Sequence, residues 1–394
     1  MNFADIFKNL WQQSGISILT EDPVRTLVMI ALGCLLLYLG IKKQFEPLLL
    51  VGIGFGMLLT NLPGAGVYHA ELWDQLTEGP ITYADILHDG GLLDILYIGV
   101  KTGLYPSLIF MGVGAMTDFG PMISNPKSIL LGAAAQIGVY AAFIMAVLLG
   151  FNGNVAACIG IIGGADGPTA IWLTKALAPE YLAPIAIAAY SYMALFPFIQ
   201  PPLMRLLTTE KERKIKMEEL KDASKTAKII FPIAVTIITC LILPSVAPLL
   251  GCLMFGNLLR ECGVTERLSK TAQNGLMNTV TLFLGVSVGA TAVGSRFLSF
   301  ETIKIIILGL LAFIFATVGG LLIGKLMCVL TKGKINPLIG SAGVSAVPMA
   351  ARVSQLEGQK ADPSNFLLMH AMGANVAGVI GSAVAAGFLF ALFG

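Results

Sequence analysis

One short stretch interrupts a long apolar region with a charge. Residues 163–169 read Gly-Gly-Ala-Asp-Gly-Pro-Thr and lie between the apolar runs 155–162 and 170–173. An aspartate at membrane depth costs about 2.5–3.5 kcal/mol on insertion, so such residues usually mark ion or proton sites. Glycine and proline break a helix, and broken backbone at this depth needs protein or water around it. We therefore expect Asp166 to be an ion ligand at a helix break or simply the N-cap of the next helix.

The composition places this stretch in a membrane protein. Of 394 residues, 56% are hydrophobic and 12% are charged, whereas soluble domains carry about 25% charged residues. A net charge of +2 gives no reason to expect nucleic acid as a partner. The cysteines form no Cys-x-x-Cys pair, and neither a His-Glu-x-x-His nor a Walker A motif occurs. These absences argue against a zinc enzyme and against direct ATP drive. An all-α polytopic membrane protein is predicted.

Apolar spans and one charged segment divide the chain. Residues 1–22 alternate apolar and polar and predict an amphipathic interfacial segment. Residues 23–204 and 229–394 then form two membrane repeats. Between them, residues 205–228 hold eight of the 25 lysines and arginines. This excess places the charged loop in the cytoplasm by the positive-inside bias.

The two halves share short motifs in the same order: Phe55-Gly56 with Phe255-Gly256, and Phe110-Met111-Gly112 with Phe283-Leu284-Gly285. The broken stretches 154–174 and 336–352 then align, with Asp166 opposite Ser345. We expect five full passes plus one re-entrant hairpin in each half, and an odd number of passes inverts the second repeat. On this scheme Lys42-Lys43 shares a side with the charged loop, and the two hairpin tips meet near the midplane.

Oxygen donors near the two breaks suit a hard monovalent cation. Asp166 supplies the charge, and the side chains that could complete an oxygen shell are Asn336, Ser345, Asn375 and Tyr192. Hard ions choose oxygen ligands, and one carboxylate balances one Na⁺. Because a proton and Na⁺ would compete for the same carboxylate, we expect the two to exchange at Asp166.

Each of the other residues has a structural alternative. Ser345 lies in a small-residue stretch that suits close helix packing, and Asn375 could bond between helices without an ion. Tyr192 could be a core aromatic with a satisfied hydroxyl. Arg352 is either an interfacial arginine or a clamp for an incoming carboxylate.

Three segments carry a resemblance to a known family. They are residues 163–169, residues 336–353, which begin Asn-Pro-Leu-Ile-Gly-Ser-Ala-Gly-Val-Ser-Ala, and residues 369–381, which contain Met-Gly-Ala-Asn-Val. They resemble the β subunit of the sodium-translocating biotin-dependent decarboxylases, which include oxaloacetate, methylmalonyl-CoA, glutaconyl-CoA and malonate decarboxylase complexes. The resemblance covers essentially the whole chain, with no departure in the hairpin motifs.

The resemblance implies a carboxybiotin decarboxylase subunit that consumes a proton and exports Na⁺ across a bacterial or archaeal cytoplasmic (inner) membrane. It also implies an elevator-type transporter fold, a homo-oligomer of this chain, a biotin carrier subunit, a carboxyltransferase subunit and a small single-span membrane subunit. The residues that match the family's functional positions are Asp166, Asn336 and Asn375 as Na⁺ ligands, Tyr192 and Ser345 in ion or proton handling, and Arg352 facing carboxybiotin.

The biotin itself must come from another chain, because no Met-Lys-Met attachment motif occurs. The alternative function is a self-sufficient Na⁺-coupled secondary transporter of small carboxylates, which inverted repeats with paired hairpins suit equally well. A purely structural anchor is disfavoured, since an anchor has no need of Asp166. The choice of acid or acyl-CoA belongs to the carboxyltransferase.

Overall fold

Helices account for the regular structure of this protein. The computed structural model describes residues 3–19, 22–344 and 348–394, and within these ranges it has helices and no strand. Five helical segments there are long and apolar enough to cross a membrane: α3 (Pro23–Lys42), Ser128–Leu148, α17 (Lys225–Ile242), α22 (Phe300–Leu330) and α24 (Leu368–Phe393). Two bent helix pairs raise the number to seven if each is one span. This is the all-helical architecture expected from the sequence, and it fits a multi-pass membrane protein.

The remaining helices before the charged loop are α1 (Phe3–Gln13), α2 (Gly15–Ile18), α4 (Pro47–Asn61), α5 (Ala70–Glu78), α6 (Tyr83–Asp89), α7 (Leu92–Lys101), α8 (Leu104–Met116), α9 (Gly120–Ser124), α10 (Ser128–Ala135), α11 (Ile137–Leu148), α12 (Gly153–Gly160), η1 (Ile161–Gly164), α13 (Gly167–Leu177), η2 (Pro179–Tyr181), α14 (Leu182–Ala194) and α15 (Phe196–Leu207). Those within and after it are α16 (Glu210–Arg213), η3 (Pro244–Val246), η4 (Ala247–Gly251), α18 (Cys252–Glu261), α19 (Glu266–Thr271), η5 (Ala272–Leu276), α20 (Met277–Ala290), α21 (Gly294–Phe297), η6 (Pro337–Gly343) and α23 (Met349–Ala361).

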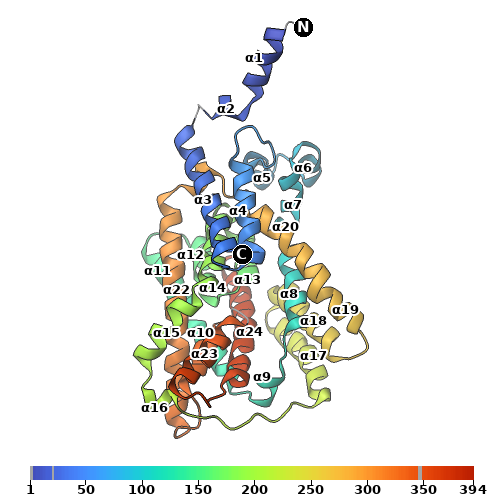
Figure 1. Cartoon of the computed structure of the whole chain (residues 1–394). Coiled ribbons are helices and arrows are strands. Elements are labelled where there is room, and N and C mark those ends of the chain that lie inside the picture. The colour runs from blue at the N-terminus through green and yellow to red at the C-terminus, as the bar shows by residue number, and fades with distance from the viewer. Residues whose placement is uncertain (1–2, 20–21, 345–347) are drawn as a thin grey trace.

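By length and composition, the five to seven candidate spans among the described residues are fewer than the ten full passes expected. α4 has 15 residues, whereas a helix needs about 20 to cross the hydrocarbon core. α18 continues directly from η4, and α20 continues from α19 and η5 without a break. Figure 1 also shows that α3, which ends at Lys42, stops near mid-height of the molecule. The side of the membrane on which Lys42-Lys43 lies relative to the charged loop stays a prediction.

The helices form two bundles that lie side by side (Figure 1). In the scaffold bundle, α4 packs along α20 and α8 along α18, with α3, α7 and α17 beside them. In the hairpin bundle, α10–α15 and α22–α24 surround the two broken stretches. The two bundles meet where α13 contacts α7 and α8, and where α14 contacts α4 and α20.

Two glycine contacts join helices of the scaffold bundle in the same manner. A Cβ added to Gly56 of α4 would lie 2.0 Å from the carbonyl oxygen of Val286 in α20. A Cβ added to Gly256 of α18 would lie 1.9 Å from the carbonyl oxygen of Met111 in α8. A larger residue would force either helix pair apart, since small residues allow membrane helices to approach closely. The repeated Phe-Gly motif thus makes the same kind of contact in both halves.

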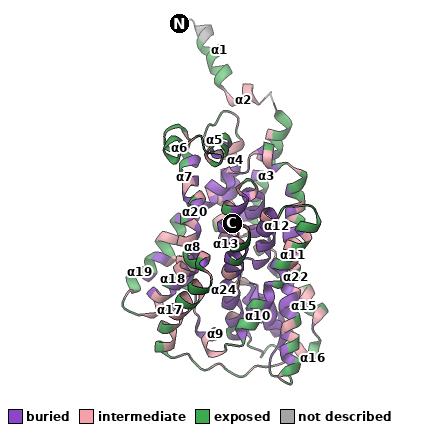
Figure 2. Ribbon diagram, turned by 180° about the vertical axis from the view of Figure 1, so that it is seen from behind, coloured by how far each residue is buried: buried purple, intermediate pink, exposed green. Residues whose placement is uncertain are grey.

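Helix α24 lies at the centre of the hairpin bundle. Figure 2 shows the buried residues gathered around α24 and α13, while α19 is largely exposed. Both η1 and η6, the short turns inside the two broken stretches, pack against α24. At the other extreme, α1 projects beyond the bundles (Figure 1) and exposes Phe7, Leu10 and Trp11 along one side. The interfacial role of residues 1–22 stays a prediction.

Candidate functional site

The first helix break is built by backbone conformation. α12 and η1 lead to Ala165, whose φ of 53° is left-handed, and α13 then starts at Gly167. The left-handed conformation costs a non-glycine residue roughly 1–2 kcal/mol. A Cβ at Gly167 would lie 2.1 Å from the ring of Tyr190 in α14. Glycine at 167 therefore lets α13 begin directly against α14, with Asp166 at the point of reversal.

The Asp166 carboxylate is held by hydroxyl groups. Its Oδ2 accepts hydrogen bonds from Thr169 Oγ1 at 2.8 Å and from Ser382 Oγ of α24 at 3.0 Å. Asp166 occupies the N-cap position of α13, as one alternative expected, but its side chain also bonds to a distant helix. No lysine, arginine or histidine among the described residues forms an ion pair with it. The site therefore presents a carboxylate that has hydrogen bonds but no protein cation.

The second break is held by an amide. Asn375 of α24 donates from Nδ2 to the carbonyl oxygens of Ala342 at 2.9 Å and Val344 at 3.0 Å. Its Oδ1 is buried and has no hydrogen-bond partner in the part of the chain that the structure describes. Ser345, the next residue along this break, lies outside the described residues, so its predicted role stays a prediction.

A single helix joins the two breaks. Asn375 and Ser382 lie seven residues apart on α24, which corresponds to about 10 Å along a helix axis. Asn375 contacts the second break and Ser382 contacts Asp166 at the first. Two of the predicted site residues are therefore linked through α24, since Asn375 belongs to this helix and Asp166 contacts it about two turns further along.

Asn336 is placed differently from Asn375. Its Nδ2 donates to the carbonyl oxygens of Arg213 at 3.0 Å and Ile215 at 2.9 Å, and its Oδ1 accepts from Leu338 N. Asn365 donates to the same two carbonyl oxygens at 3.0 and 3.1 Å. The two asparagines thus clamp the charged loop onto the second broken stretch. The structure does not bring Asn336 to Asp166, and its role as a Na⁺ ligand stays a prediction.

The two tyrosines of α14 face different ways. Tyr192 donates its hydroxyl to the carbonyl oxygen of Ile306 in α22, and its ring lies 6.5 Å from that of Phe313. Tyr190, two residues and about 200° away around the helix, lies against Gly167 beside Asp166. The sequence analysis named Tyr192 and missed Tyr190. A Tyr-Ser-Tyr motif alone cannot show which ring faces a break, because that depends on the rotation of α14.

Arg352 and Arg205 contrast in their surroundings. Arg352 of α23 is exposed and makes no ion pair among the described residues. Arg205 of α15 forms a two-pronged pair with Glu357, Nε–Oε2 at 2.9 Å and Nη2–Oε1 at 3.0 Å. Lys360 adds a third contact to Glu357 at 2.6 Å. Arg352 therefore remains available for an incoming anion, whereas Arg205 fastens α15 to α23.

Asp166 borders a cavity of about 170 Å³ between the two bundles. Its polar lining comprises Asp166 and Tyr190 from the hairpin bundle and Glu46, Asn278 and Thr281 from the scaffold bundle. The sequence analysis did not single out Glu46, because it lies beside Pro47 in what reads as an ordinary interhelical turn. The described residues hold no cluster of three or more His, Cys, Asp or Glu side chains. A cation here would be bound by carboxylates and neutral oxygens.

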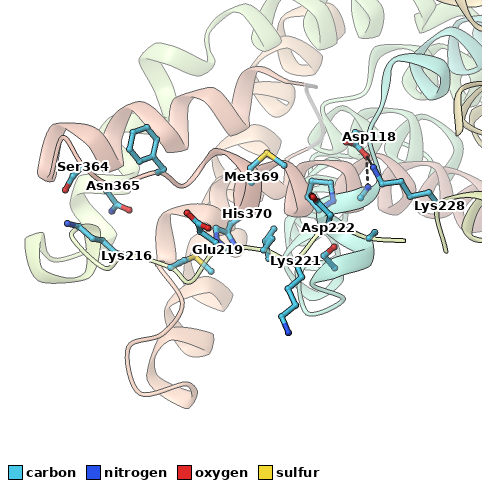
Figure 3. Close-up of a pocket in the computed structure, with 17 residues that line it drawn as sticks. Asp118, Lys216, Glu219, Lys221, Asp222, Lys228, Ser364, Asn365, Met369 and His370 are labelled. Carbon is cyan, nitrogen blue, oxygen red and sulfur yellow. Dashed lines mark hydrogen bonds and ion pairs between the residues drawn. The ribbon is translucent and has the colours of Figure 1, made fainter. Parts of the chain in front are cut away.

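A second cavity, of about 520 Å³, lies under the charged loop (Figure 3). Figure 3 shows Glu219 beside His370 and an ion pair between Asp118 and Lys228, whose atoms are 3.2 Å apart. Partial burial raises the pKa of Asp118, but bonds from Gly120 N and Lys228 outweigh it and leave this pKa below its usual value. His370 Nδ1 and Asn365 Oδ1 are buried without protein partners. The cavity therefore offers unsatisfied polar atoms next to mixed charges.

Comparisons with known proteins cover the whole chain. The family of the Na⁺-transporting oxaloacetate decarboxylase beta subunit matches residues 25–393. Methylmalonyl-CoA decarboxylase subunit beta of Propionigenium modestum is 60% identical over 375 residues, covering 94% of this chain and 95% of that protein. Glutaconyl-CoA decarboxylase subunit beta of Acidaminococcus fermentans is 57% identical over 367 residues and covers 93% of each. The oxaloacetate decarboxylase beta chain of Klebsiella pneumoniae is 52% identical over 405 residues, covering 92% and 94%. The resemblance is thereby confirmed, and the chain belongs to the family of Na⁺-transporting oxaloacetate decarboxylase beta subunits.

Proposed function

We propose that this chain decarboxylates carboxybiotin and couples the reaction to Na⁺ export. The observation that carries the proposal is Asp166, a carboxylate at a helix break that bonds to Thr169 and Ser382 and has no cationic partner among the described residues. A carboxylate in such surroundings is stabilised by a proton or a bound cation. Membership in a sodium-transporting family supports Na⁺ as this cation.

Exchange of Na⁺ and H⁺ at Asp166 would couple the two processes. Decarboxylation replaces the N–COO⁻ bond of carboxybiotin with an N–H bond, so each turnover releases CO₂ and consumes one proton. If that proton leaves Asp166 as Na⁺ binds there, the chemistry and the ion movement proceed together. Asn375, Asn336, Ser345 and Tyr192 are the proposed partners in ion and proton handling, and Asn375 is supported by its position on α24 near Ser382.

Carboxybiotin would arrive on the carrier subunit at the end of the molecule formed by α9, α16 and the charged loop. Arg352 is exposed and unpaired, and a guanidinium suits a planar carboxylate. The cavity of Figure 3 adds unsatisfied donors and acceptors at His370 and Asn365. On this proposal the charged loop faces the cytoplasm and the membrane is the cytoplasmic (inner) membrane. The other partners are a carboxyltransferase, a single-span membrane subunit and further copies of this chain.

The coupled movement would be that of an elevator-type transporter. The contacts of Gly56 with α20 and of Gly256 with α8 support two related repeats, since the Phe-Gly helix of each half packs on a helix of the other half. The hairpin bundle, which holds both breaks, would move against the scaffold bundle. Each ion would then bias the population of inward- and outward-facing states.

Reconstitution tests the proposal against its alternative. Proteoliposomes containing this chain with its carrier and carboxyltransferase subunits should accumulate Na⁺ when substrate is added, and avidin should stop the uptake. Vesicles with this chain alone should take up neither citrate nor malate. Na⁺-coupled uptake of a free carboxylate by the chain alone would favour the secondary transporter instead.

A further inference from the structure

The turn between α3 and α4 holds an acidic side chain in strained backbone. Gln44 and Glu46 have left-handed φ values of 55° and 36°, which cost non-glycine residues roughly 1–2 kcal/mol each. Glu46 stands at the N-cap of α4, yet its side chain makes no capping hydrogen bond. Backbone strain persists where the surrounding structure enforces it. Here it leaves the Glu46 side chain uncommitted to the helix end, and the residue lines the cavity beside Asp166.

Glu46 has no partner of opposite charge. The neighbouring basic residues, Lys42 and Lys43, are exposed, and neither forms an ion pair with it. Its surroundings are mostly apolar, with Leu49 and Phe110 lining the same cavity. A half-buried carboxylate without a hydrogen-bond donor or a cation is costly. Another charge is therefore needed for this side chain to remain ionised.

The cavity joins Glu46 to the proposed ion site. Of its polar lining, Glu46 and Thr281 belong to the scaffold bundle, whereas Asp166 belongs to the hairpin bundle. Asn278, also on the scaffold side, is exposed, so the cavity opens there to the outside of the bundles. Two carboxylates that face one cavity disfavour each other's ionised form, because their charges repel. A monovalent cation between them converts that repulsion into attraction.

An independent observation points to a ligand in the same space. Tyr190 is 2% exposed, and its hydroxyl has no hydrogen-bond partner among the described residues. The ring lies against Gly167, and the residue lines the cavity together with Asp166 and Glu46. Buried hydroxyls almost always have a partner. A bound cation could be ligated by the hydroxyl oxygen, and a water bound to that cation could accept the hydroxyl proton.

We propose that Glu46 is the counter-charge of the scaffold bundle for the Na⁺ bound at Asp166, so that the ion passes between two carboxylates, one from each bundle. Glu46 attracts the cation and Tyr190 supplies a neutral oxygen between the two. This inference rests on the proposed function. It describes the path by which Na⁺ reaches or leaves Asp166. Glu46 is a positioning residue for the ion and takes no part in the chemistry of carboxybiotin.

The test compares Glu46→Gln with the unaltered complex, assembled with its partner subunits. We measure the Na⁺ concentration at half-maximal decarboxylation, the rate at saturating Na⁺, and equilibrium binding of ²²Na⁺. Removing one of two charges should raise the half-saturating Na⁺ concentration about tenfold. The rate at saturating Na⁺ should stay within about twofold, because the reacting groups are untouched.

Conservative and control variants separate charge from packing. Glu46→Asp retains the charge and should recover most of the Na⁺ affinity, whereas a purely structural role would leave it as impaired as Glu46→Gln. Tyr190→Phe should raise the half-saturating concentration by a smaller factor, about threefold. Glu71→Gln, an exposed acidic residue of α5, should change nothing.

Unchanged Na⁺ half-saturation and ²²Na⁺ binding in Glu46→Gln overturn the inference. If that variant does not assemble, an unchanged Na⁺ response in Tyr190→Phe overturns it equally. The proposed function fails separately, when Asp166→Asn keeps its Na⁺ dependence. If the Na⁺ response changes in Asp166→Asn but not in Glu46→Gln or Tyr190→Phe, the proposed function stands. Only the role of Glu46 as a second carboxylate is then overturned.

Discussion

The two helix breaks are built alike and charged differently. At the first, the Asp166 carboxylate accepts hydrogen bonds from two hydroxyls. At the second, the groups facing α24 are the carbonyl oxygens of Ala342 and Val344, which accept from the Asn375 amide. The first break therefore carries a charge that an ion can neutralise, whereas the second is a neutral clamp. Substitutions at the first should change ion affinity most, and substitutions at the second should add a loss of stability to any effect on the ion.

The largest effect is expected from Asp166→Asn. The amide keeps the size of the side chain and loses the charge, and losing one partner of a buried charge pair costs roughly 3–5 kcal/mol. Na⁺-stimulated decarboxylation and Na⁺ uptake should fall at least about 100-fold. The matched control is Asp89→Asn, an exposed aspartate paired only with His88. If Asp166→Asn still pumps Na⁺, the charge at the first break does not distinguish it from the second.

The next effect compares two residues of α24. Asn375→Ala removes both donors to the second break and leaves buried carbonyls unsatisfied, at about 1–3 kcal/mol each. We expect its thermal unfolding midpoint to fall by several degrees. Ser382→Ala removes one donor to Asp166 and should instead shift Na⁺ half-saturation by about fivefold. Equal loss of stability in both variants, with unchanged Na⁺ response, contradicts the comparison.

A smaller effect concerns the clamp on the charged loop. Asn336 and Asn365 donate to the same carbonyl oxygens, those of Arg213 and Ile215. Either alanine variant alone should loosen the loop by about 1 kcal/mol, because the other amide remains. Limited trypsin digestion at Lys214 and Lys216 should therefore accelerate modestly in each single variant and strongly in the double variant. If Asn336→Ala lowers the Na⁺ affinity but leaves the rate of trypsin digestion unchanged, Asn336 acts as an ion ligand rather than as a clamp on the loop.

The smallest effect is a pH response. Hydrogen bonds from Ser364 Oγ and N, together with Lys216, hold the pKa of Asp362 at about 2. This pKa lies below the pKa of about 3.9 that an aspartate has in an unfolded chain. The ionised Asp362 therefore stabilises the folded loop fully above about pH 3.9, and this stabilisation is lost as the pH falls through about 2. Hydrogen exchange of the loop, corrected for the intrinsic rate, should be constant between about pH 5 and pH 8. A marked change across that range would show that another group anchors the loop.

Local sequence patterns predicted much of the fold. Glycine and proline near Asp166 and at 336–352 lie where the structure breaks the helices, since these residues act on backbone conformation within a few positions. The number of full passes was less well predicted, because an apolar run does not reveal that α4 has only 15 residues. The Phe-Gly motif at 55–56 and 255–256 did indicate a repeated helix contact.

The sequence by itself determined the class of this protein and the positions of its two breaks, because hydrophobicity and backbone preference are properties of neighbouring residues. It also determined the family, through motifs that extend along the whole chain. Only the tertiary structure decided which side chains meet at Asp166. Ser382 is 216 residues away, and Tyr190 and Glu46 reach the same cavity from separate bundles. Such meetings depend on how helices rotate and pack against one another, and that is set by the whole fold at once.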